Sequence, residues 1–115
     1  MNEQIKVPKF YIDLLDQIFE IEKKVESLTE SNSIGRNILR LKEMFEQLEA
    51  DGGLTFHNPI GEFYNESRTD LEASIAGNSA DNLVVTEVIK PIVRYRKGGI
   101  TLIARKGVVV VESKS

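Results

Sequence analysis

Apolar side chains recur at helical spacing through the first part of the chain. Steps of three and four residues separate Tyr11, Leu14, Ile18, Ile21, Val25 and Leu28. This heptad spacing predicts an amphipathic helix from about Pro8 to Thr29. Ser31-Asn32-Ser33 is a predicted turn and N-cap. After it comes a second stripe with the same spacing: Ile34, Ile38, Leu41, Phe45 and Leu48. We expect Asp51-Gly52-Gly53 to end the second helix, because glycine readily adopts the left-handed C-cap conformation.

The short connection predicts that the two helices form an antiparallel hairpin. Leu15 and Phe19 widen the first apolar stripe beyond what one partner helix can cover. We therefore expect a second copy to cover the hairpin, giving a homodimer with a four-helix bundle. The expected dimer interface consists of Leu14, Leu15, Ile18, Phe19, Ile38, Leu41 and Phe45.

The pattern changes character at Gly52-Gly53. Beyond it, short runs rich in Val, Ile and Thr predict the strands Leu54–Phe56, Val84–Ile89, Ile92–Arg96, Ile100–Arg105 and Val108–Glu112. Thr69 and Glu72 match a capping box, which favours a single helical turn within residues 69–76. The expected fold class is α+β: a helical hairpin in residues 1–51, used for dimerisation, and a small all-β domain for partner binding in residues 54–115.

Composition excludes several kinds of chemistry. The 115 residues suit one small domain, alone or with a helical appendage. They include no cysteine, which excludes disulfides, thiolate zinc sites and a cysteine nucleophile. His57 is the single histidine and has no obvious acidic neighbour in the sequence, so a structural or surface role is expected for it. We expect neither an enzyme nor a bound metal or cofactor.

Charge and hydropathy bear on partners and location. A net charge of −3 argues against a chain built mainly to bind nucleic acid. The N-terminus carries no apolar signal-peptide region and no apolar run is long enough to span a membrane, so a cytoplasmic location is expected.

One basic cluster surrounds the hairpin turn predicted at Arg96-Lys97-Gly98-Gly99, and consists of Arg94, Arg96, Lys97, Arg105 and Lys106. It suits a charged edge that prevents sheet-to-sheet aggregation, or a contact surface for an acidic protein or nucleic acid. Many small β barrels bind nucleic acid, but only Tyr95 supplies an aromatic ring near this cluster.

The order of parts resembles the C-terminal region of the GrpE family, the nucleotide-exchange factors of DnaK-type chaperones. The matching segments are Phe10–Leu15, Ile38–Phe45 with Gly53-Leu54, Asn58–Asn65, Glu72-Ala73, Val84–Ile89, and Ala104–Gly107 with Val108–Val111. The family's motif histidine is Leu71 here, and its turn arginine corresponds loosely to Lys97-Gly98-Gly99. Its long N-terminal helix has no counterpart, so the resemblance is to a short form.

This resemblance implies a non-enzymatic co-chaperone of the stress response. Such a protein would bind the ATPase domain of a DnaK-type chaperone and promote exchange of adenine nucleotide. We expect Arg94, Arg96, Lys97 and Arg105 to contact that partner. A scaffold or adaptor without exchange activity stays open as an alternative, and so does, less favourably, a nucleic-acid-binding β domain.

Overall fold

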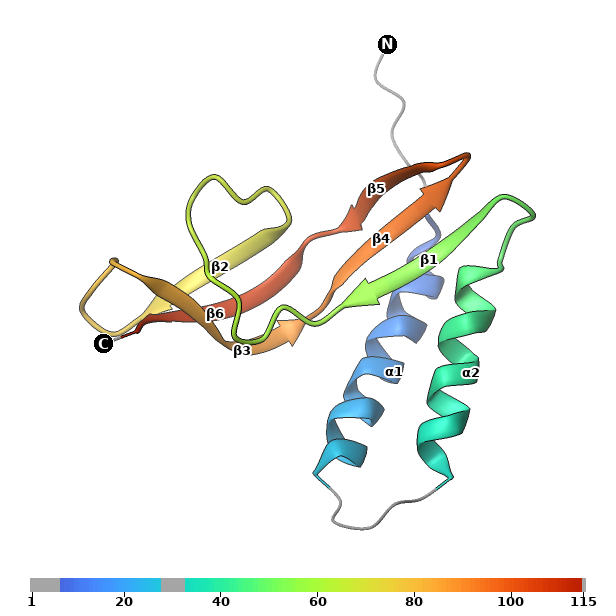
Figure 1. The fold of residues 1–115 in the computed structure, drawn as a ribbon, viewed down its shortest axis with the longest axis horizontal. Coiled ribbons are helices and arrows are strands. Elements are labelled where there is room, and N and C mark those ends of the chain that lie inside the picture. The colour runs from blue at the N-terminus through green and yellow to red at the C-terminus, as the bar shows by residue number, and fades with distance from the viewer. Residues whose placement is uncertain (1–6, 28–32, 115) are drawn as a thin grey trace.

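The computed structural model describes residues 7–27 and 33–114 of the chain, and the expected turn at Ser31-Asn32 lies outside them. Figure 1 shows two helices followed by six strands in two three-stranded sheets. The elements are α1 (Lys9–Glu26), α2 (Ile34–Glu46), β1 (Gly52–His57), β2 (Leu71–Ala76), β3 (Leu83–Lys90), β4 (Ile92–Lys97), β5 (Ile100–Arg105) and β6 (Gly107–Ser113). The protein is thus a small α+β protein in which strands outnumber helices.

The strands form two sheets, which we call sheet A and sheet B. Sheet A has the order β1-β4-β5 and is antiparallel throughout. Sheet B has the order β2-β6-β3, with β2 parallel and β3 antiparallel to the central β6. Both helices lie on one side of sheet A, and β5 leads almost directly into β6, so one stretch of chain joins the two sheets (Figure 1).

Two clusters of buried apolar side chains hold the molecule together. In the cluster of sheet A, Leu15 and Ile18 of α1 and Ile38 and Phe45 of α2 contact Leu54 and Val93. In the cluster of sheet B, Phe19 of α1 packs among aliphatic strand residues: Leu71, Leu83, Val85, Val88, Ile92, Val109 and Val111. The apolar face of α1 is therefore shared between the two sheets.

The expected fold class, a helical hairpin completed as a four-helix bundle by a second copy, is wrong. More residues lie in strands than in helices, and the sheets of the same chain cover the buried face of the helices. Leu15 and Phe19 are 0% and 1% exposed. Heptad spacing identifies an apolar helix face, but it carries no information about what covers that face.

The same finding corrects the expected dimer interface. Within this one chain five of its members are already buried: Leu15, Ile18, Phe19, Ile38 and Phe45. Leu14 and Leu41 stay 38% and 39% exposed. A second copy could reach only these two without the core opening.

Several expected boundaries also change. Helix α1 ends at Glu26, and Thr29, its expected end, lies outside the described residues. Ser33 is the N-cap of α2 but makes no side-chain capping bond. That helix ends at Glu46. Gly52 and Gly53, which were expected to end it, belong to β1.

Residues 71–76 form strand β2 and not the expected helical turn. The capping box at Thr69 and Glu72 is a local preference, which pairing with β6 overrides. In that pairing Leu71 lies opposite Gly107 and Ile75 opposite Val111.

Gly53 permits the close contact between α2 and β1. A Cβ atom at this position would lie 2.2 Å from the Glu46 carbonyl oxygen and 2.4 Å from that of Phe45. Backbone atoms cannot move aside cheaply, so any side chain here forces the helix end away from the sheet. Gly53 therefore serves strand–helix packing instead of helix capping, whereas a Cβ at Gly52 would lie 2.0 Å from the Arg96 carbonyl oxygen of β4.

Gly53→Ala should lower the free energy of unfolding by about 1–3 kcal/mol, because overpacking displaces the end of α2. Urea unfolding monitored by circular dichroism measures the change. Gly35→Ala is the matched control, since a Cβ at Gly35 meets nothing within 4 Å and alanine favours helix. Equal losses in the two variants would contradict this account of Gly53.

Candidate functional site

Arg105, one of the four expected partner contacts, is an internal clamp. At the end of β5 its Nη1 and Nη2 atoms donate to the two carboxylate oxygens of Asp16 in α1, at 2.6 and 2.7 Å. Nη2 also donates to the Pro91 carbonyl oxygen at 2.7 Å. The Arg105 and Asp16 side chains are 21% and 18% exposed. This paired fork geometry fixes α1 to sheet A. The Nε of Arg105 makes no hydrogen bond but is buried, so it is not accessible to a partner protein.

Arg94, the second expected contact, belongs to a polar network on sheet A. Its Nη2 lies 3.5 Å from Asp70, whose carboxylate also accepts two bonds from Arg68, at 2.9 and 3.0 Å. Arg68 reaches Glu62 at 3.2 Å, and Glu62 contacts His57 Nε2 at 2.5 Å. The network ties the segment after β1 back onto β1 and β4.

The network gives His57 an acidic partner that the sequence did not suggest. The partner is Glu62, five residues along the chain. The hydrogen bond from Arg68 is the main cause that lowers the pKa of Asp70, and the same bond raises the pKa of Arg68. These groups bind one another, so we assign the network a structural role.

Arg96 and Lys97, the other two expected contacts, lie at the exposed β4–β5 turn. Gly98 and Gly99 form this turn with φ of 60° and 80°. Lys97 Nζ lies 3.5 Å from Glu49, whose charge is the main cause that raises the pKa of Lys97. Arg96 has no ion-pair partner within residues 7–27 and 33–114. The four expected contacts therefore divide into two pairs. Arg94 and Arg105 bind carboxylates within the chain, whereas Arg96 and Lys97 are exposed at the turn.

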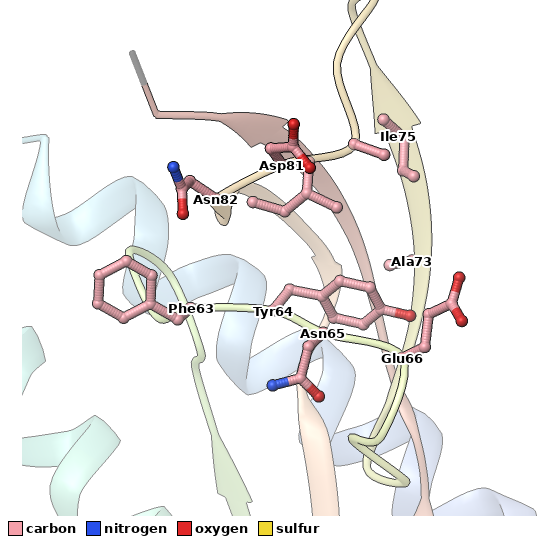
Figure 2. A pocket seen from close by; sticks show the side chains of 10 residues that line it. Phe63, Tyr64, Asn65, Glu66, Ala73, Ile75, Asp81 and Asn82 are labelled. Atoms are coloured by element: carbon pink, nitrogen blue, oxygen red, sulfur yellow. The ribbon is translucent and has the colours of Figure 1, made fainter.

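A pocket of about 680 Å³ lies at the far end of sheet B from the helices (Figure 2). Its lining combines apolar side chains of β2 with two loops: Phe63, Tyr64, Asn65, Glu66, Ala73, Ile75, Ala80, Asp81, Asn82 and Leu83. The Tyr64 ring points toward Ala73, and the Phe63 ring lies at the opposite side and is 68% exposed. Sequence reasoning missed this pocket, because it depends on residues 71–76 being a strand.

Two searches of the described residues bear on chemistry and location. No group of three or more His, Cys, Asp or Glu side chains there is placed to hold a metal ion. Nor is any helix in this part of the chain long and apolar enough to cross a membrane.

Comparison with known proteins returned no match: no family model, no curated protein and no solved structure matches this chain.

Asp16→Asn should lower the free energy of unfolding by about 1–3 kcal/mol, because it leaves a half-buried guanidinium without its counter-charge. Urea unfolding at neutral pH measures the loss. Asp13→Asn removes an exposed pair with Lys9 and should cost less than about 0.5 kcal/mol. Similar losses in both variants would mean that the Arg105 clamp adds little.

The stabilisation from Asp70 should depend on pH in a defined direction. Its folded pKa lies below the ordinary value of 3.8, so its contribution is complete above that value. The contribution disappears as the pH falls from 3.8 through the lower folded pKa. We expect the difference in unfolding free energy between the wild type and Asp70→Asn to be large at pH 7 and to shrink below pH 3.8. A difference independent of pH would exclude this charge-assisted role.

Proposed function

We propose that this protein is a non-enzymatic co-chaperone that binds the ATPase domain of a DnaK-type chaperone and accelerates release of adenine nucleotide. The support is the sequence resemblance to the GrpE family, together with one observation. The basic turn between β4 and β5 projects from the end of sheet A, with Arg96 and Lys97 exposed (Figure 1). A projecting cationic turn suits contact with an acidic protein surface.

The proposed mechanism is a coupling between two binding equilibria. A partner that binds the open form of a nucleotide cleft more tightly than the closed form weakens nucleotide binding by the same factor. No bond is made or broken by the exchange factor, so its side chains need only recognise one shape of the partner. Arg96 and Lys97 are the proposed contacts. Arg94 and Arg105 are engaged within the chain and only 33% and 21% exposed, whereas Lys97, although paired with Glu49, is 58% exposed.

The proposal places the protein in the cytoplasm and retains a homodimer. Leu14 and Leu41 are the members of the expected interface that stay on the surface, so they are the positions left for contact with a second copy.

An adaptor without exchange activity is the second candidate. It is favoured by the engagement of Arg94 with Asp70 and of Arg105 with Asp16, which leaves fewer free cations than the sequence suggests. An adaptor would bind the same ATPase domain without changing the lifetime of bound nucleotide.

Stopped-flow release of fluorescent ADP from a DnaK-type ATPase domain tests the exchange role. The rate of ADP release should rise with the concentration of this protein and then reach a plateau. Arg96→Glu should raise the half-saturating concentration about tenfold, the equivalent of about 1.4 kcal/mol.

Arg40→Glu on α2 is the control, because it makes the same charge change at another exposed site. Release that is unaltered at saturating protein would contradict exchange. If binding persisted in that case, the adaptor would be the better account. An equal effect of the two charge reversals would contradict a contact through the turn.

A further inference from the structure

Strand β5 presents a free edge. In sheet A it pairs with β4 on one side, and no strand within residues 7–27 and 33–114 pairs with its other side. Its side chains are unusually apolar for such a position: Ile100, Leu102 and Ile103 are 62%, 45% and 38% exposed. Natural proteins protect edge strands with charges, proline or bulges, because a bare edge pairs readily with another strand. Here residues 100–104 carry no charge and no proline, and the single bulge of this pair lies at the Val93 end.

The turn determines which backbone groups of β5 point outward. A two-residue turn with both central φ angles positive is a type I′ hairpin, and its flanking residues form a hydrogen-bonded pair. Lys97 and Ile100 are this pair, and Tyr95 and Leu102 are the next hydrogen-bonded pair. The amide and carbonyl groups of Thr101 and Ile103 therefore face the free edge. No backbone hydrogen bond outside the strand pairing engages them among the described residues.

Charge at the two ends of the strand indicates what occupies this edge. At one end Arg96 lies across from Thr101, beside Lys97, which is paired with Glu49 but 58% exposed. Lys106 follows β5 at the other end. Antiparallel pairing with a second copy would bring the turn cations of each copy to the Lys106 end of the other. Parallel pairing would place like cations side by side. Both arrangements are repulsive, whereas a strand with carboxylates at both ends is complementary.

We propose that β5 binds an extended segment of a partner protein by strand addition. The segment carries apolar or threonine side chains at its centre, beside Ile100, Leu102 and Ile103, and acidic side chains at both ends. Main-chain bonds to Thr101 and Ile103 supply affinity, and the flanking cations supply specificity. This binding mode goes beyond the proposed exchange role, and it stands whether or not the partner is a DnaK-type chaperone.

A labelled peptide tests the proposal without the chaperone. Fluorescence anisotropy compares binding of Asp-Glu-Val-Thr-Val-Thr-Val-Glu-Asp with the same centre flanked by Lys and Arg. The acidic peptide should bind at least about tenfold more tightly at low salt, and its advantage should shrink at high salt as the charges are screened. Equal binding of the two peptides would overturn the charge argument.

Thr101→Pro tests the edge itself. Proline removes the outward N–H of Thr101, which makes no bond to β4, and proline is tolerated at such an edge position. We expect the acidic peptide to bind about tenfold less tightly, while Thr101→Val, which keeps the N–H, binds as the wild type does. Unchanged binding by a folded Thr101→Pro variant would overturn strand addition at β5.

A surface variant keeps the proposal testable if Thr101→Pro does not fold. Arg96→Glu combined with Lys106→Glu should reverse the preference, so that the basic peptide binds more tightly. Failure to reverse would contradict the assignment of these cations. Self-association of the wild type that Thr101→Pro abolishes and Thr101→Val leaves intact, with no peptide binding, would show a second copy on this edge and overturn the proposal.

Discussion

The arrangement of the whole molecule depends on how one face of α1 is buried. Leu15 and Ile18 pack in the cluster of sheet A, and Phe19, one residue further on, packs in the cluster of sheet B. Between them Asp16 holds Arg105, near the point where β5 leads into β6. One helical segment thus contacts both sheets and the chain that joins them. These side chains are buried within the chain, whereas the outer faces of the helices still expose apolar side chains such as Phe10, Leu39 and Met44.

The sheets in turn determine which surfaces are available for binding. Strand order places β4 in the centre of sheet A, with its turn exposed and β5 bare on the outer side. In sheet B, residues 61–64 lie along the outer side of β3, where Gly61 N–H donates to Val85 O and Tyr64 N–H to Leu83 O. That edge is covered, whereas the edge at β5 is open. The outer edge of β2 in sheet B likewise has no neighbouring strand among the described residues. The cations at the two ends of β5, together with its open edge, therefore make sheet A the binding side in this account.

The sequence predicted the parts of the fold that depend on local pattern. Both helices, the β4–β5 turn and the strands rich in Val and Ile lie within a few residues of where periodicity and glycine placed them. It did not predict β2, whose conformation depends on parallel pairing with β6, about 36 positions along the chain. Nor could it predict the cover of the helices, because hydrophobic spacing describes one surface and not its partner.

The candidate site was predictable only as a set of charges. The sequence brought Arg94, Arg96, Lys97 and Arg105 together near one hairpin, but it could not separate engaged cations from free ones. That separation depends on Asp16 and Asp70, which come from distant segments. The signal was weak even for His57, since a partner five residues away in a loop follows no regular spacing.

Hydrogen–deuterium exchange of this protein with and without a DnaK-type ATPase domain tests most directly whether sheet A is the binding side. Mass spectrometry would follow exchange in peptides covering β4, β5 and α2. The account predicts slower exchange at Thr101, Ile103 and the β4–β5 turn in the presence of the partner, with exchange in α2 unchanged. Protection confined to the helices, or no protection in any peptide, would contradict it.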